Sequence, residues 1–165
     1  MKFLCILLLI PALSIGQTVH IKDEKIVYEG KETVAGLSSS EIFSRIQKVL
    51  PDIVKNYEVD TQSSNSISAK GELKLRTPYT VIRTVSYFIF VNAMGNGYEY
   101  RIDSVSFTKK ERGGKAVTRS SEEVIEGISE TGKVVGETEK ILNETDMKFQ
   151  RVLALLRSEI KNADR

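Results

Sequence analysis

Apolar and polar residues alternate with a period of two from Tyr57 to Lys110, the pattern of strands that bury one face. Turn-forming residues divide this stretch into four segments. The last segment follows the predicted hairpin turn Met94-Gly95-Asn96-Gly97, in which Asn-Gly is the strongest short-range hairpin signal. A change of phase near Asp103-Ser104 predicts a β-bulge. The pattern therefore predicts an antiparallel meander of four strands.

A further strand, over residues 24–35, and then a helix are predicted ahead of the meander. The start of this helix has the residues of a capping box and a hydrophobic staple, which are Ser38 with Glu41 and Leu37 with Ile42. Pro51 should kink or end the helix near Val49, or open a short second turn to about Lys55.

A second helix is predicted after the meander, over residues 143–161, with Asn143 as its N-cap. Its apolar side chains form one stripe, made of Phe149, Val152, Leu153, Leu156 and Ile160. Residues 109–141 form a charged insert between the meander and this helix. Ser120 and Glu123 would cap a helix within the insert, but its glycines predict that this helix is weak or broken.

The N-terminus has the pattern of a secretory signal peptide. Residues 1–16 contain one lysine, an unbroken apolar run and then small residues, which predicts cleavage between Gly16 and Gln17. The apolar run is too short for a membrane anchor, which needs about 20 residues. Residues 17–165 would remain as one domain without a transmembrane segment, in a periplasmic, envelope-associated or extracellular location. Cleavage would also remove Cys5, the only cysteine.

Three stretches of the chain resemble a bacterial family of exported proteins of unknown function. They are Gly36-Leu37-Ser38-Ser39-Ser40-Glu41-Ile42-Phe43, Ser66-Ile67-Ser68-Ala69-Lys70-Gly71 and the Tyr98–Phe107 part of the terminal hairpin. That family has a fold like the TATA-binding protein (TBP-like), and the likeness covers roughly residues 24–110. The resemblance implies an α+β fold with a curved five-stranded antiparallel sheet in β-α-β-β-β-β-α order and helices on one face. It implies no catalytic or ligand-binding residues.

Composition excludes several classes of function. A net charge of +2 is not the strongly basic balance of a dedicated nucleic-acid binder. One cysteine excludes a disulfide framework, and a single histidine, His20, argues against a histidine-based metal centre or catalytic triad. No cofactor, metal site or catalytic residue is predicted.

The outward face of the long third strand, residues 80–93, is the first candidate contact surface. If Val85 and its alternate neighbours point towards the helices, Phe88 and Phe90 point away from them, beside Thr84 and Ser86. Two aromatic side chains on an open sheet face form an apolar patch, which usually marks a contact site. The alternative is that the charged insert folds over this face and makes it a second small core.

The positively charged start of the insert is the second candidate surface. It comprises Lys109, Lys110, Arg112, Lys115 and Arg119. This turn could meet the anionic surface of a cell envelope, or it could be a solvated loop that the acidic residues after it partly neutralise.

We therefore expect a non-enzymatic, exported binding or adaptor domain that acts on a protein or an envelope component. The alternative is a hydrolase that uses carboxylates on an envelope or dietary polymer. A deep pocket with two facing carboxylates would favour the enzyme, and a shallow aromatic sheet face would favour the binding domain.

Overall fold

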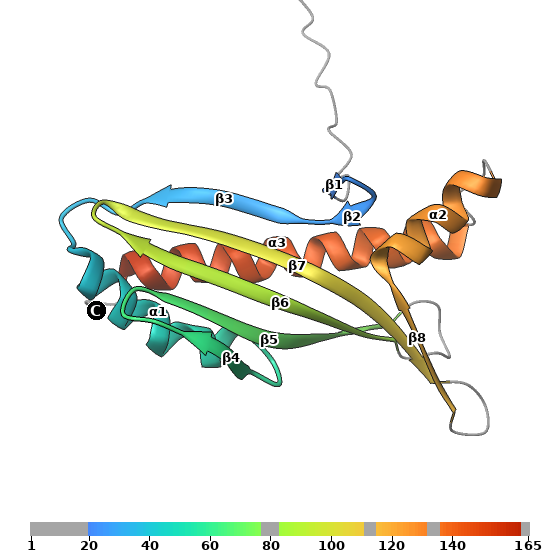
Figure 1. The fold of residues 1–165 in the computed structure, drawn as a ribbon, viewed down its shortest axis with the longest axis horizontal. Helices are drawn as coiled ribbons and strands as arrows, with labels where there is room; N and C mark the ends of the chain where they lie inside the picture. Colours follow the sequence, from blue (N-terminus) through green and yellow to red (C-terminus); the bar gives the residue numbers. More distant parts are fainter. Residues whose placement is uncertain (1–19, 77–82, 111–114, 132–135, 163–165) are drawn as a thin grey trace, which may run out of the picture.

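The computed structural model describes residues 20–76, 83–110, 115–131 and 136–162 (Figure 1). The predicted signal peptide lies outside these residues, so the division into residues 1–16 and 17–165 stays a prediction. No helix in the described ranges is long and apolar enough to cross a membrane.

A six-stranded antiparallel sheet forms the centre of the molecule (Figure 1). Its path runs β3-β7-β6-β5-β4, and β8 pairs with the second half of β7. The strands are β3 (Tyr28–Thr33), β4 (Glu58–Gln62), β5 (Ser66–Leu75), β6 (Arg83–Met94), β7 (Gly97–Lys110) and β8 (Ala116–Ser120). Two short strands, β1 (Ile21–Lys22) and β2 (Lys25–Ile26), pair with each other before β3.

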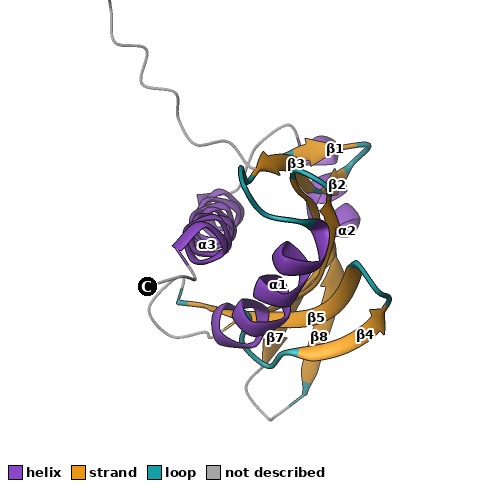
Figure 2. Cartoon of the chain, turned by 90° about the vertical axis from the view of Figure 1, so that its left-hand side faces the viewer, coloured by secondary structure: helices purple, strands orange, loops and turns teal. Residues whose placement is uncertain are grey.

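Two helices pack against each other on one face of this sheet, α1 (Ser39–Ile53) and α3 (Gly136–Asn162) (Figure 2). A third helix, α2 (Ser121–Thr131), contacts β2, β7 and β8. We call the sheet side that carries α1 and α3 the helix face and the opposite side the outer face. The α+β class and the helices on one face are confirmed.

The sheet has one strand more than the five that were expected, because β8 forms within the predicted charged insert. Its composition is not that of a buried strand, since Val117 is its only large apolar side chain and Arg119 follows two positions later. The strand pairs through its backbone with residues 106–110 of β7, an edge that β3 leaves open. Backbone pairing with β7, rather than the pattern of its own side chains, therefore makes this segment a strand.

The first helix begins as predicted, with Ser38 as N-cap and a reciprocal capping box with Glu41. It does not end near Val49, however, because α1 continues through Pro51 to Ile53. Proline removes one backbone donor, and near a helix end this costs a single hydrogen bond. The backbone N–H of Val54 still donates to the Leu50 carbonyl at 2.9 Å.

The last helix begins at Gly136 and not at Asn143, which is an exposed residue within α3. The buried stripe extends about two turns earlier than predicted, through Ile141 and Leu142. Thr145, fully buried, donates its hydroxyl to the Ile141 carbonyl at 2.7 Å. Packing of this early turn outweighs the capping propensity of Asn143.

The β6–β7 hairpin and the bulge both form where they were predicted. Met94 pairs with Gly97 across a two-residue turn, and the register of β6 and β7 shifts opposite Ser104, whose φ is +52°. A Cβ at Gly97 would lie 1.9 Å from the Glu32 carbonyl oxygen of β3, so only glycine fits there. The bulge returns the apolar side chains of β7 to the helix face.

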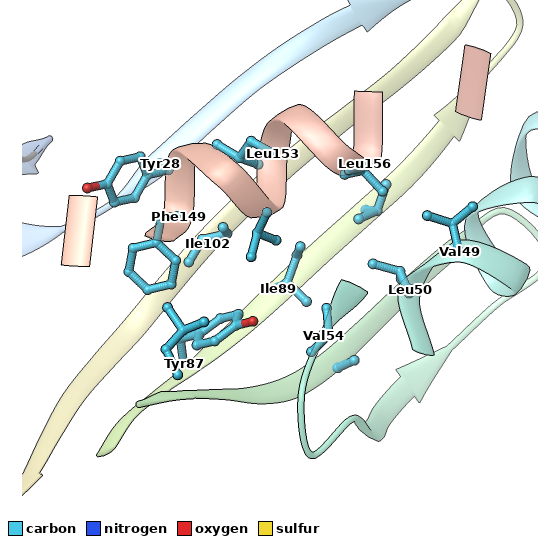
Figure 3. Packing of buried hydrophobic residues seen from close by; sticks show 14 of the residues in the cluster. Tyr28, Val49, Leu50, Val54, Tyr87, Ile89, Ile102, Phe149, Leu153 and Leu156 are labelled. Atoms are coloured by element: carbon cyan, nitrogen blue, oxygen red, sulfur yellow. The ribbon is translucent and has the colours of Figure 1, made fainter. Parts of the chain in front are cut away.

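The core lies between the sheet and the two helices (Figure 3). Phe149 of α3 is fully buried and contacts two tyrosine rings, with centroid distances of 5.2 Å to Tyr28 and 5.0 Å to Tyr87. The Tyr28 hydroxyl donates to Asp146 Oδ1 at 2.8 Å, and the buried Tyr87 hydroxyl has no hydrogen-bond partner among the described residues. A single side chain of α3 thus connects β3 to β6.

Candidate functional site

The outer face contains the aromatic pair that the alternation of β6 predicted. Tyr87 and Ile89 are buried on the helix face, and Phe88 and Phe90 therefore lie on the outer face. Phe90 is 37% exposed and Phe88 is half-buried. Large exposed apolar side chains at the centre of a sheet usually mark a contact site.

Polar and charged residues of the neighbouring strands surround this pair. Phe90 stands between Ser68 of β5 and Arg101 of β7, and Phe88 stands between Lys70 and Asp103. These cross-strand neighbours place a polar rim around an aromatic centre, which is the anatomy of many protein interfaces.

The charges next to Phe90 are already paired with one another. Arg101 Nε donates to Asp103 Oδ2 at 2.7 Å, and Lys31 Nζ lies 3.4 Å from Glu99 Oε2. Asn92 Nδ2 donates to Glu99 Oε1 at 2.9 Å. This hydrogen bond, and then Lys31, lower the pKa of the Glu99 carboxyl below its ordinary value. The Glu99 carboxyl is therefore ionised at neutral pH.

A shallow hollow of about 380 Å³ lies beside Phe90 on the outer face, over the β3–β7 pair. Gly30 and Tyr100, which are cross-strand partners, lie among its lining residues. A side chain of a partner that packs on Phe90 would enter this hollow.

Thr84 and Ser86 continue the outer face towards one end of the sheet. Both are half-buried, with Thr84 opposite Thr108 and Ser86 opposite Ser106. The hydroxyl oxygens of Thr108 and Thr118 lie 2.8 Å apart, in hydrogen-bond contact. This end of the face is polar, so the apolar part of the surface is confined to Phe88 and Phe90.

The described part of the insert does not fold over the aromatic pair. Residues 116–120 join the edge of the sheet as β8, and α2 contacts β2, β7 and β8. Val124 and Ile125 of α2 pack against the main core. The alternative of a second small core over Phe88 and Phe90 has no support among these residues.

The structure separates the cations of the predicted basic turn. Lys109 and Arg119 line a pocket on the helix face, whereas Lys110 alternates to the outer side of β7. Lys115 is exposed just before β8, and Arg112 lies outside the described residues. In the part of the chain that the structure describes, these side chains therefore do not form one continuous surface for contact with an anionic envelope.

We call the pocket that contains Lys109 and Arg119 the end pocket. It has a volume of about 330 Å³ and lies where β6, β7 and β8 meet α2 and α3. Three of its lining residues were not predicted to belong to a site: Arg83 and Glu137 have no signal in the sequence pattern, and Glu123 has only that of a helix cap. They come from β6, α2 and α3, and only the packing of these elements brings them together.

Both carboxylates of the end pocket already have partners. Glu123 caps α2, because the backbone N–H of Ser120 donates to its Oε2 at 2.8 Å, and Glu137 pairs with Arg83. Acid–base hydrolysis needs two carboxylates that face each other and are free to exchange protons with the substrate. Neither carboxylate of the end pocket is free in this way. Among the described residues, no group of three His, Cys, Asp or Glu side chains is placed to hold a metal ion.

Comparisons with known proteins identify the fold. No protein-family model and no curated protein matches the sequence. A TBP-like protein from Parabacteroides distasonis superposes with a TM-score of 0.70 at 16% identity, covering 87% of this chain and 97% of that one. A DUF4468 family protein from Bacteroides ovatus superposes with a TM-score of 0.60 at 17% identity, covering 86% and 91%. The chain has a TBP-like fold, so the expected resemblance is confirmed at the level of the fold.

Proposed function

We propose that this chain is a non-enzymatic binding domain, exported to the bacterial cell envelope, that holds another polypeptide on its outer face. The observation that carries the proposal is the uncovered aromatic pair, with Phe90 37% exposed on a face from which the described helices are absent. A TBP-like fold alone implies no function, so the proposal rests on this surface.

The partner is inferred from the chemistry around the pair. Phe88 and Phe90 offer an apolar centre, and the ion pairs around them contain both signs of charge. A surface of mixed sign has no attraction for a uniformly anionic polymer, whereas it fits a protein with an apolar side chain at the centre of its own interface. Buried aromatic side chains supply most of the binding energy in such interfaces.

The proposal is tested with the double variant Phe88→Ser/Phe90→Ser. We expect it to lose at least ten-fold in affinity for proteins captured from the envelope fraction of the native host, measured by quantitative mass spectrometry and then by titration. Its free energy of unfolding should fall by only about 1–2 kcal/mol, less than the 3–5 kcal/mol typical of a buried phenylalanine.

Leu155→Ser is the matched control, because Leu155 is also 37% exposed but lies on α3, away from the outer face. This control should capture the same proteins as the unmodified chain. Equal capture by the double variant would exclude the outer face as the contact surface. A fall in stability as large as that of a core variant would show that Phe88 and Phe90 are structural.

Export has its own test. The first 16 residues have the pattern of a signal peptide, and we expect the protein isolated from its native host to begin at Gln17. Intact-mass measurement of the protein from the periplasmic and extracellular fractions checks this. A chain that keeps Met1 and remains in the cytoplasmic fraction would remove the envelope from the proposal and leave the outer face to be tested by capture alone.

A further inference from the structure

Among the residues that the structure describes, the lining of the end pocket has more positive than negative charge. Arg83, Lys109 and Arg119 line it, against the two carboxylates of Glu123 and Glu137. Arg83 and Glu137 neutralise each other through their ion pair. Lys109 and Arg119 have no ion pair among the described residues, so the pocket has room for an anion that the chain itself does not supply.

Arg83 also keeps an unused donor. Its side chain is only 17% exposed, and its buried Nε has no hydrogen-bond partner in the part of the chain that the structure describes. An unpaired buried donor is costly, and most native structures satisfy such groups. An acceptor oxygen in the pocket would satisfy it. This observation is independent of the count of charges.

Apart from Thr138, the rest of the described lining is apolar. Phe107 and Ile141 are each 4% exposed, and Val124 packs beside them from α2. A volume of about 330 Å³ is at the small end of the range for pockets that hold organic ligands. A free inorganic ion would use the cations and leave this apolar wall without a partner.

We propose that the end pocket binds a small organic monoanion, a carboxylate with an aliphatic body. Its carboxylate lies against Lys109, Arg119 and the free Nε–H of Arg83, and its aliphatic part packs on Phe107 and Ile141. One negative charge balances the formal surplus of one positive charge in the lining. The site is separate from the outer face, on the opposite side of the sheet.

Sodium octanoate, below its micelle concentration, is the probe. Isothermal titration should give saturable one-to-one binding, and octanoate should raise the melting temperature. Two comparison ligands separate the parts of the proposal. 1-Octanol has the aliphatic body without the charge, and inorganic phosphate has the charge without the body. Each should bind at least ten-fold more weakly than octanoate.

The variant Lys109→Gln/Arg119→Gln should weaken octanoate binding at least ten-fold. The matched control is Lys110→Gln/Lys115→Gln, which removes the same charge from β7 and from the residue just before β8 without touching the pocket. The single variant Arg119→Gln, at an exposed residue, repeats the test if the double variant is not folded. Absence of octanoate binding, equal binding of phosphate, or an equal loss in the control would each overturn the proposal. None of these results bears on capture by the outer face.

Discussion

Replacing Phe149 with alanine should lower the free energy of unfolding by about 3–5 kcal/mol, the usual cost of removing a fully buried phenylalanine. The ring contacts Tyr28 of β3 and Tyr87 of β6, on either side of β7. Aromatic pairs of this kind contribute about 0.5–1.5 kcal/mol beyond the area they bury. Small domains have only about 5–15 kcal/mol of stability in total, so this one change removes a large part of it.

Urea unfolding followed by circular dichroism measures the effect. Leu155→Ala on the same helix is the control, because Leu155 is 37% exposed and its loss should change stability by about 0.5 kcal/mol or less. A loss below about 1.5 kcal/mol for Phe149→Ala would mean that α3 does not hold β3 and β6 together through this ring.

Local rules made α1 predictable from the sequence. The capping box of Ser38 and Glu41 joins residues three apart, so nothing distant decides it. The same holds for the Gly95–Asn96 turn and for the bulge at Ser104, which the phase of the β7 side chains revealed. Each of these features depends on neighbours within a few positions.

Features that depend on distant partners were missed. The strand β8 has a composition typical of a loop and exists because β7 offers it an open edge. The early start of α3 has a similar cause, because Ile141 and Leu142 pack into the core that distant strands form, and the backbone N–H of Arg76, just after β5, donates to the Glu144 carboxylate of the same helix at 3.1 Å. This hydrogen bond joins residues 68 positions apart, and no local sequence pattern predicts it.

The two candidate sites also differ in whether a local sequence pattern predicts them. The outer-face pair could be predicted because strand alternation assigns Phe88 and Phe90 to the side opposite Tyr87. The end pocket could not, because its lining comes from three strands and two helices. Sequence reasoning grouped Lys109 with Lys110 by proximity along the chain, and the alternation of β7 places them on opposite sides of the sheet.

Raising the pH above 10 should unfold this protein through its buried tyrosines. Burial raises the pKa of Tyr87 to about 12, and burial is also the main cause of the raised pKa values of Tyr28 and Tyr98. An unfolded tyrosine ionises near pH 10, so between pH 10 and 12 the unfolded chain binds fewer protons than the folded one. Stability is therefore full below pH 10 and falls as the pH rises. The share of Tyr87 is about 2 kcal/mol by pH 12.

Tyr87→Phe isolates this share from the lysines, which also titrate near pH 10.4. Within the described ranges the Tyr87 hydroxyl has no hydrogen-bond partner, so the variant should be as stable as the unmodified chain at pH 7, or about 1 kcal/mol more stable. Its advantage should widen steadily between pH 10 and 12 in urea unfolding. Tyr28→Phe is the contrasting variant: because the Tyr28 hydroxyl donates to Asp146, its removal should destabilise the chain at pH 7. Burial is the cause of the raised pKa of Tyr87. Parallel plots of stability against pH for the unmodified chain and Tyr87→Phe would therefore contradict a buried Tyr87 that stays protonated above pH 10.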